Sequence, residues 1–184
     1  MDFFNPPIEG LVVVNPRVFK DNRGYFFESY NQRAWKEAGI TADFVQDNES
    51  FSTRNTLRGL HFQKPPFAQA KLVRVLEGAV WDVAVDLRAG SATFGKWFGV
   101  ELSSENKKQF FIPRGFAHGF SVLTETARFA YKCDNFYNKS AEGAVRFDDP
   151  ELAVDWKIDL SKAVLSEKDL KNPLFAEYKK SVIF

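Results

Sequence analysis

Short apolar segments at a regular spacing constrain the fold of this chain more than any other feature. Four of them read as strands and cover residues 72–76, 80–87, 97–102 and 110–113. The residues between them favour turns and include Glu77-Gly78, Gly90-Ser91 and the run 103–106. A spacing of roughly ten residues leaves no room for the crossover helices of a parallel sheet. The pattern therefore predicts an all-β sandwich or barrel.

The size and composition of the chain fit one β-rich domain. Its 184 residues suit a single core, and an aromatic content of 16% favours sheets that pack face to face. The net charge is +1, and the chain has no block of basic residues. This argues against nucleic acid or a membrane surface as a partner and favours a small molecule. Cys133 is the only cysteine, so no intrachain disulfide can form. We interpret it as a packing residue. No N-terminal apolar run is long enough for a signal peptide or a membrane span, so we expect a cytoplasmic protein.

The N-terminal part of the chain reads as strands, a turn and one short helix. Strands are expected at 11–14, 17–19 and 25–30, with a turn at 21–24. A helix is expected at 31–38, with Asn31 as its N-cap and Gly39 as its stop. Its apolar content is small, which predicts a surface position. Near the other terminus, Ser166 and Asp169 have the spacing of a capping pair that opens a helical end piece.

Two further strands carry polar side chains along one face. Gln46, Asn48 and Ser50 alternate within 44–51, and this polar row fits either an outer face or the wall of a pocket. Asp82 and Asp86 point away from the apolar face of 80–87, so we expect one core face and one polar face there.

One short strand, residues 56–63, carries the most chemically suggestive side chains. It contains His61, one of only two histidines in the chain. A single histidine among apolar neighbours is most often a packing residue. Here, however, Arg58 and Lys71 bring two cations into the same region, which is unfavourable unless an anion lies between them. Arg58 and His61 have opposite parity on a regular strand, and a bulge or kink at Gly59 would bring both side chains into one pocket.

The motifs of several catalytic classes are missing from the chain. The second histidine, His118, lies far from His61 in a segment bracketed by glycines, and no His-x-His pair exists to suggest a catalytic metal. No nucleophile elbow, phosphate-binding glycine loop or dinucleotide fingerprint is present. The remaining possibility is acid/base chemistry without a cofactor, with His61 as base, Lys71 as a fixed charge and Tyr131, on a strand at 127–136, as proton donor. This set suits proton abstraction beside a carbonyl group.

The motifs together resemble those of the dTDP-4-dehydrorhamnose 3,5-epimerase family. The resemblance runs from Ile8 to Pro173 and is carried by LRGLHFQ (57–63), KLV (71–73), VDLR (85–88), IPRGFAHGF (112–120), YK (131–132) and LSEKD (165–169). It implies a jelly-roll (cupin) double-sheet barrel with short peripheral helices. In such a fold, residues 1–50 would form N-terminal strands and a dimer arm, 51–150 the core and 151–184 a helical appendage of a single domain. It also implies a homodimer that exchanges N-terminal strands.

The same resemblance implies a substrate and a role for each site residue. The substrate would be dTDP-4-dehydro-6-deoxy-glucose, epimerised at C3 and C5. His61 would be the base, held by Asp169, while Tyr131 reprotonates the sugar and Lys71 stabilises the enolate. The residues that match substrate-binding positions are Arg23, Glu28, Gln46, Asn48, Arg58, His118, Tyr137, Glu142 and Lys168, with Tyr137 stacking on thymine and Arg23 holding the diphosphate.

The chain departs from the family pattern at two positions outside the acid/base set. Phe62 replaces the commoner tyrosine, and Lys157 follows Trp156 where proline is usual. Relatives with the same acid/base residues invert only one carbon or act on other deoxysugars. The alternatives are therefore a mono-epimerase or ketoisomerase of a related dTDP-keto sugar, or a nucleotide-sugar binding module without turnover.

Overall fold

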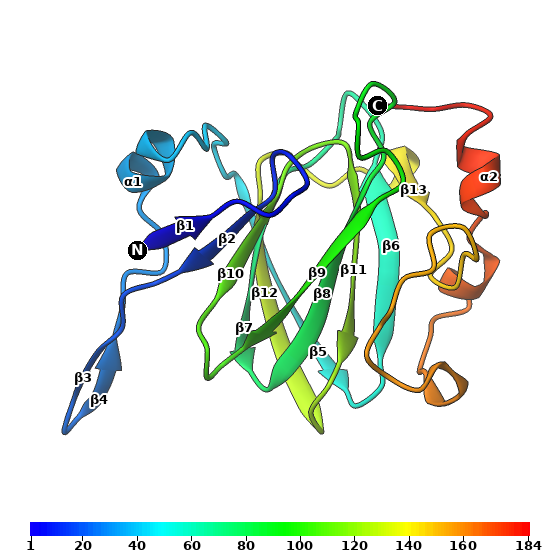
Figure 1. Ribbon diagram of the computed structural model, residues 1–184. Coiled ribbons are helices and arrows are strands. Elements are labelled where there is room, and N and C mark those ends of the chain that lie inside the picture. The colour runs from blue at the N-terminus through cyan, green and yellow to red at the C-terminus, as the bar shows by residue number, and fades with distance from the viewer.

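Two antiparallel sheets face each other and enclose the central core (Figure 1). The computed structural model describes residues 1–184. The first sheet has the order β1 (Asp2–Phe4), β2 (Val12–Asn15), β10 (Gln109–Ile112), β7 (Lys71–Glu77), β12 (Thr126–Cys133) and β5 (Gln46–Thr53). The second has the order β13 (Glu142–Ala144), β6 (Leu57–Gln63), β11 (Phe116–Val122), β8 (Ala79–Asp86) and β9 (Trp97–Ser103). The all-β, double-sheet prediction is confirmed, although the two sheets do not join into one closed barrel.

The sequence pattern did not reveal the central strand β11. His118 lies in it between Gly115, which directly precedes the strand, and Gly119, and the strand pairs with β6 on one side and β8 on the other. All of its residues are buried, since it is covered on both faces. A strand covered on both faces lacks the alternation of apolar and polar residues that marks a half-buried strand.

The N-terminal region contains a hairpin that projects away from the two sheets (Figure 1). Strands β3 (Phe19–Asp21) and β4 (Gly24–Phe26) pair only with each other. The predicted strand at 25–30 is therefore wrong beyond Phe26, because residues 27–30 have no strand partner. The aromatic rings of Phe19, Tyr25 and Phe26 are exposed on this hairpin.

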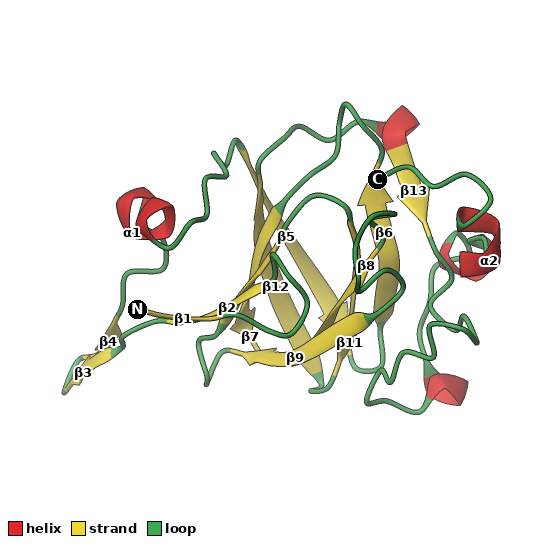
Figure 2. Ribbon diagram, turned by 45° about the horizontal axis from the view of Figure 1, so that its top comes forward, coloured by secondary structure: helices red, strands yellow, loops and turns green.

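Helix α1 (Gln32–Glu37) begins where the sequence predicts. The side-chain oxygen of Asn31 accepts hydrogen bonds from the backbone of Arg33 and Ala34, which caps the helix. The helix lies on the periphery (Figure 2), as expected from its small apolar content. It is fixed there by a single anchor, Trp35, which is only 1% exposed and packs against Phe111 of β10.

The C-terminal segment covers the outer face of the five-stranded sheet. It contains short 3-10 turns at Leu160–Lys162 (η2) and Asp169–Lys171 (η3) and the helix α2 (Phe175–Tyr178), while η1 (Lys139–Ala141) precedes β13. Short peripheral helices are thus confirmed. Apolar side chains of this segment pack against Val83 and Val85 of β8. The polar face of β8 consequently turns inward, and Asp82 and Asp86 are both fully buried.

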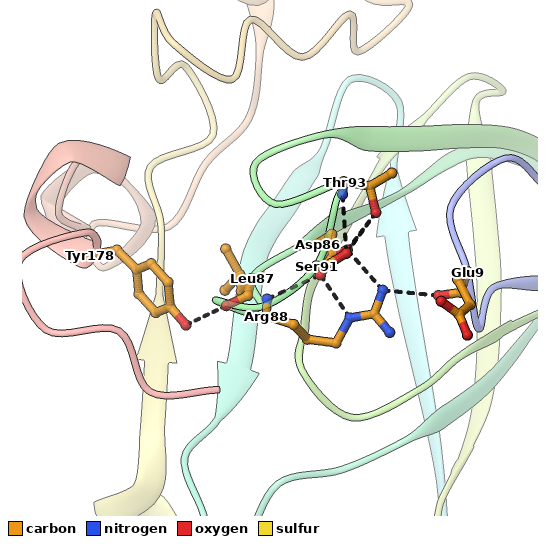
Figure 3. Close-up of polar contacts among 7 residues, drawn as sticks. All are labelled: Glu9, Asp86, Leu87, Arg88, Ser91, Thr93 and Tyr178. Carbon is orange, nitrogen blue, oxygen red and sulfur yellow. Dashed lines mark hydrogen bonds and ion pairs between the residues drawn. The ribbon is translucent and has the colours of Figure 1, made fainter.

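A polar network at the end of β8 joins the two ends of the chain to the core (Figure 3). The Asp86 carboxylate accepts hydrogen bonds from Arg88, Ser91 and Thr93. The Arg88 guanidinium also donates to the carbonyl oxygen of Glu9. On the opposite side, the Tyr178 hydroxyl donates to the carbonyl of Leu87. No helix in the structure is both long and apolar enough to span a membrane.

Candidate active site

A cavity of about 610 Å³ opens between the two sheets and collects most of the predicted site residues. Its walls come from β5, β6, β7, β11 and β12, and the segment around η3 closes one side. The predicted site residues that line it are Arg58, His61, Lys71, His118, Tyr131, Tyr137, Glu142, Lys168 and Asp169.

An irregularity in β6 places both Arg58 and His61 in this cavity. On the facing strand β11, Phe120 lies opposite Arg58 and His118 lies opposite His61. Three steps along β6 therefore match two steps along β11, which is the register of a bulge. Gly59 lies inside this irregularity. Its φ is 147°, a backbone conformation that residues with a side chain rarely adopt. The predicted break in regular pairing at Gly59, by a bulge or a kink, is confirmed.

His61 forms a hydrogen bond with Asp169, a residue far along the chain. The Nε2 atom of His61 lies 2.5 Å from Oδ1 of Asp169, which is only 3% exposed. Burial by itself would raise the pKa of Asp169, but hydrogen bonds from His61, Ser166 and Asn172 outweigh it and hold the pKa below its usual value. An ionised Asp169 can only accept hydrogen bonds, so Nε2 carries the proton and, in neutral His61, Nδ1 carries the lone pair.

Lys71 and Tyr131 lie on adjacent strands of the opposite sheet. The Nζ atom of Lys71 is 5.8 Å from the centre of the Tyr131 ring. Burial raises the pKa of the Tyr131 phenol, so the group is protonated and able to donate at neutral pH. Burial lowers the pKa of the Lys71 ammonium, and the negative charge of the Asp82 carboxylate opposes that shift.

Asp82 is a site residue that the sequence did not indicate. Both of its carboxylate oxygens lie near Nε2 of His118, at 3.1 and 3.0 Å. Burial lowers the pKa of His118 and raises that of Asp82, and their mutual hydrogen bond opposes both shifts. Asp82 is thus the buried hydrogen-bond partner of His118, and its carboxylate charge acts on Lys71. The alternation of Asp82 with apolar residues along the strand suggested only that one face of β8 is polar. The sequence pattern does not reveal that the C-terminal segment covers the apolar face.

Three polar side chains form a chain at the mouth of the cavity. The Tyr137 hydroxyl donates to Oε1 of Glu142 at 3.0 Å, and Lys168 forms an ion pair with the other oxygen of the same carboxylate. The Lys168 contact is the first cause of a lowered Glu142 pKa. The ring of Tyr137 is half exposed and therefore offers a surface on which a flat ligand can stack.

Four predicted site residues do not line the cavity. Gln46 and Asn48 lie behind it: Gln46 accepts a hydrogen bond from the Tyr137 backbone, and Asn48 contacts the Cys133 sulfur at 3.7 Å. The row on β5 nevertheless reaches the cavity through Ser50, so its reading as a pocket wall holds in part.

Arg23 and Glu28 lie in the projecting N-terminal region, away from the cavity of their own chain. The Arg23 side chain is 85% exposed and pairs only with Asp21 of the same hairpin. No group of three or more His, Cys, Asp or Glu side chains is arranged to hold a metal ion.

Comparison with known proteins places this arrangement in a family. Residues 5–177 match the sequence model of dTDP-4-dehydrorhamnose 3,5-epimerase. A Pseudomonas aeruginosa protein of that name is 54% identical, with 92% of this chain and 93% of the relative covered. A crystal structure of a dTDP-4-dehydrorhamnose 3,5-epimerase from Elizabethkingia anophelis is 57% identical, with a TM-score of 0.93 and coverage of 96% and 97%.

A second crystal structure carries a bound sugar nucleotide. It is a dTDP-6-deoxy-D-glucose-3,5-epimerase from Legionella pneumophila in complex with dTDP-4-keto-L-rhamnose. It is 46% identical to this chain, covers 99% of it and 96% of the Legionella chain, and has a TM-score of 0.94. The double-sheet fold, the cavity and these matches over nearly the whole length agree with one another, and the chain therefore belongs to the dTDP-4-dehydrorhamnose 3,5-epimerase family.

Proposed function

We propose that this protein inverts C3 and C5 of dTDP-4-dehydro-6-deoxy-glucose and so forms dTDP-4-dehydro-L-rhamnose. Membership of the family supports this reaction and this substrate. The observation that carries the proposal is the convergence of the His61–Asp169 pair, Lys71 and Tyr131 on one cavity. The reaction needs a base, a charge for the enolate oxygen and a proton donor, and these residues supply all three.

The chemistry begins at the carbon-bound hydrogens beside the C4 ketone. Nδ1 of His61 takes the proton from the carbon, and the electron pair left behind moves onto the ketone oxygen as an enolate. The Lys71 ammonium stabilises that oxygen by charge. Tyr131 then gives its proton to the opposite face of the carbon, which inverts the centre. His61 returns its proton to solvent and Tyr131 regains one, and the cycle is repeated at the second carbon.

The remaining residues bind the substrate around the reacting ring. Tyr137 stacks on thymine, and Arg58 and His118 contact the sugar and the phosphate next to it. Glu142 and Lys168 exchange their mutual contact for contacts with the ligand, while Gln46 and Asn48 support the wall behind it.

We propose that Arg23 and Glu28 reach the site of a second copy. The hairpin that carries Arg23 extends away from its own cavity and exposes three aromatic rings, which a partner subunit would cover. A homodimer with exchanged N-terminal strands would bring the Arg23 guanidinium to the diphosphate of the partner's ligand. The active enzyme is then the dimer.

Incubation with the 4-keto sugar nucleotide in deuterated water tests this function. Deuterium is expected at both C3 and C5, because each proton returned to carbon comes from solvent. Substitution His61→Asn should abolish this exchange while leaving the affinity for dTDP nearly unchanged. Label at a single carbon would identify a mono-epimerase, a shifted keto group a ketoisomerase, and the absence of any exchange a binding module.

A further inference from the structure

The two oxygens of the Asp169 carboxylate have different partners. Oδ1 pairs with His61, whereas Oδ2 accepts a hydrogen bond of 2.8 Å from the hydroxyl of Ser166. The Ser166 oxygen in turn accepts a hydrogen bond of 3.1 Å from the backbone N–H of Asp169. Asn172 adds a longer contact of 3.4 Å to Oδ1. Ser166 is therefore the only side chain bonded to the oxygen that faces away from His61.

This division matters because an aspartate carboxylate rotates easily. The terminal torsion of aspartate has broad, roughly two-fold preferences, so the backbone alone does not fix the plane of the carboxylate. The bond from Ser166 to Oδ2 fixes that plane and keeps Oδ1 directed at the imidazole. Without it, Oδ2 of a residue that is only 3% exposed would lose its one hydrogen-bond donor.

The backbone near Ser166 is tied to the strand that carries the base. Val164 forms a parallel bridge to Thr56, its N–H donates to the carbonyl of Asn55, and its carbonyl accepts from the N–H of Leu57, the first residue of β6. Ser166 follows this anchor by two positions. The serine thus holds Asp169 in a fixed position relative to β6, the strand from which His61 projects.

We propose that Ser166 is a positioning residue of the base: its hydroxyl orients Asp169 so that His61 keeps Nε2–H on the carboxylate and Nδ1 free for the substrate. The inference rests on the proposed function, in which His61 takes a proton from carbon. It assigns to the predicted capping pair a second role. Ser166 also lines the cavity, but the proposed role acts through Asp169.

The chain offers a matched control for a purely structural role. At η2, the Ser161 hydroxyl donates to Oδ1 of Asp159 at 2.7 Å, and the same oxygen accepts from the Ser161 backbone at 3.0 Å. This pair is exposed and lies outside the cavity. Ser161→Ala therefore removes a serine–aspartate hydrogen bond of similar length without touching the base.

The experiment compares Ser166→Ala and Ser166→Thr with Ser161→Ala, with kcat, KM, deuterium exchange, dTDP affinity and the unfolding midpoint as readouts. Ser166→Ala should lower kcat on the order of 10- to 100-fold, as loss of an orienting partner does. Its KM and dTDP affinity should change little. Ser166→Thr, which keeps the hydroxyl, should restore most of kcat, and Ser161→Ala should have the kcat of the wild type.

A double substitution separates positioning from general destabilisation. If Ser166 acts through Asp169, adding Ser166→Ala to Asp169→Asn should lower kcat no further than Asp169→Asn alone. An additive loss, or a wild-type kcat in Ser166→Ala, would overturn the inference while leaving the proposed epimerase in place. Absence of exchange by the wild type would instead overturn both. Should Ser166→Ala fail to fold, Ser166→Val, which has no donor, is compared with Ser166→Thr of the same shape, and an equal kcat in these two variants would equally overturn the inference.

Discussion

Substitution of Asp86 by asparagine should destabilise the protein without removing its active site. The Asp86 carboxylate is fully buried and accepts hydrogen bonds of 2.6 to 3.0 Å from the Arg88 backbone and guanidinium and from the Ser91 and Thr93 hydroxyls (Figure 3). Asparagine keeps the shape but removes the charge. It also turns one acceptor oxygen into an NH₂ group that faces other donors.

The pKa of Asp86 gives the size of the effect. Burial alone would raise this pKa, but the hydrogen bonds from Arg88, Ser91 and Thr93 lower it from 3.8 to about 2. A shift of that size corresponds to about 2 kcal/mol of stability from the ionised form. Because the mispaired donors of Asp86→Asn add a further cost, we expect a total loss of about 2–4 kcal/mol near neutral pH.

The pH dependence of the loss follows from the direction of the shift. A carboxyl group whose pKa is lower in the folded state contributes its full stability above its unfolded pKa of 3.8. The contribution disappears as the pH falls through about 2. The difference in stability between the wild type and Asp86→Asn should therefore be constant near neutral pH and shrink below 3.8.

Urea unfolding followed by tryptophan fluorescence, at one fixed protein concentration, measures this difference. With a slope of about 2 kcal/mol per M, the midpoint should fall by about 1–2 M. Asp155→Asn, which removes an exposed pair with Lys157, should cost less than about 0.5 kcal/mol. A loss in Asp86→Asn no larger than this control, or one that persists undiminished at the lowest pH, would refute the reasoning.

Two further predictions concern the site itself. Lys71→Met should lower the rate of solvent exchange at the sugar by about 10²- to 10³-fold, as loss of one group that stabilises an oxyanion does, and an unchanged rate would exclude Lys71 from enolate stabilisation. Arg23→Ala and His61→Asn should each be nearly inactive alone, but a mixture of the two refolded together should regain activity. If Arg23 instead serves the site of its own chain, the mixture will stay inactive.

The local pattern of the sequence predicts the strands and the acid/base set well. The position of Gly59 between Arg58 and His61 was enough to predict a bulge or a kink, because a regular strand would place the two side chains on opposite faces. His61, Lys71 and Tyr131 could be chosen from residue type and the lack of other motifs, and all three line one cavity.

Long-range features could not be predicted in the same way. Asp169 meets His61 only after the whole C-terminal segment has folded back, so its role came from the family resemblance. Asp82 is buried because its face of β8 is turned toward the six-stranded sheet, and a distant segment takes the apolar face on the other side. Arg23 lies outside the cavity of its own chain, and the homodimer, like the cytoplasmic location, stays a prediction.

The contact between β6 and β11 restricts two positions jointly. A methyl group on Gly59 would lie 2.7 Å from the α-carbon of Gly119, and one on Gly119 would lie 2.7 Å from the carbonyl oxygen of Arg58. Backbone atoms of Gly119, Arg58 and Gly59 occupy the volumes that these Cβ atoms would need, so neither position can gain a side chain unless the backbone shifts. Glycine is therefore required at both positions. A library randomised at residues 59 and 119 should recover function only from variants that keep both glycines.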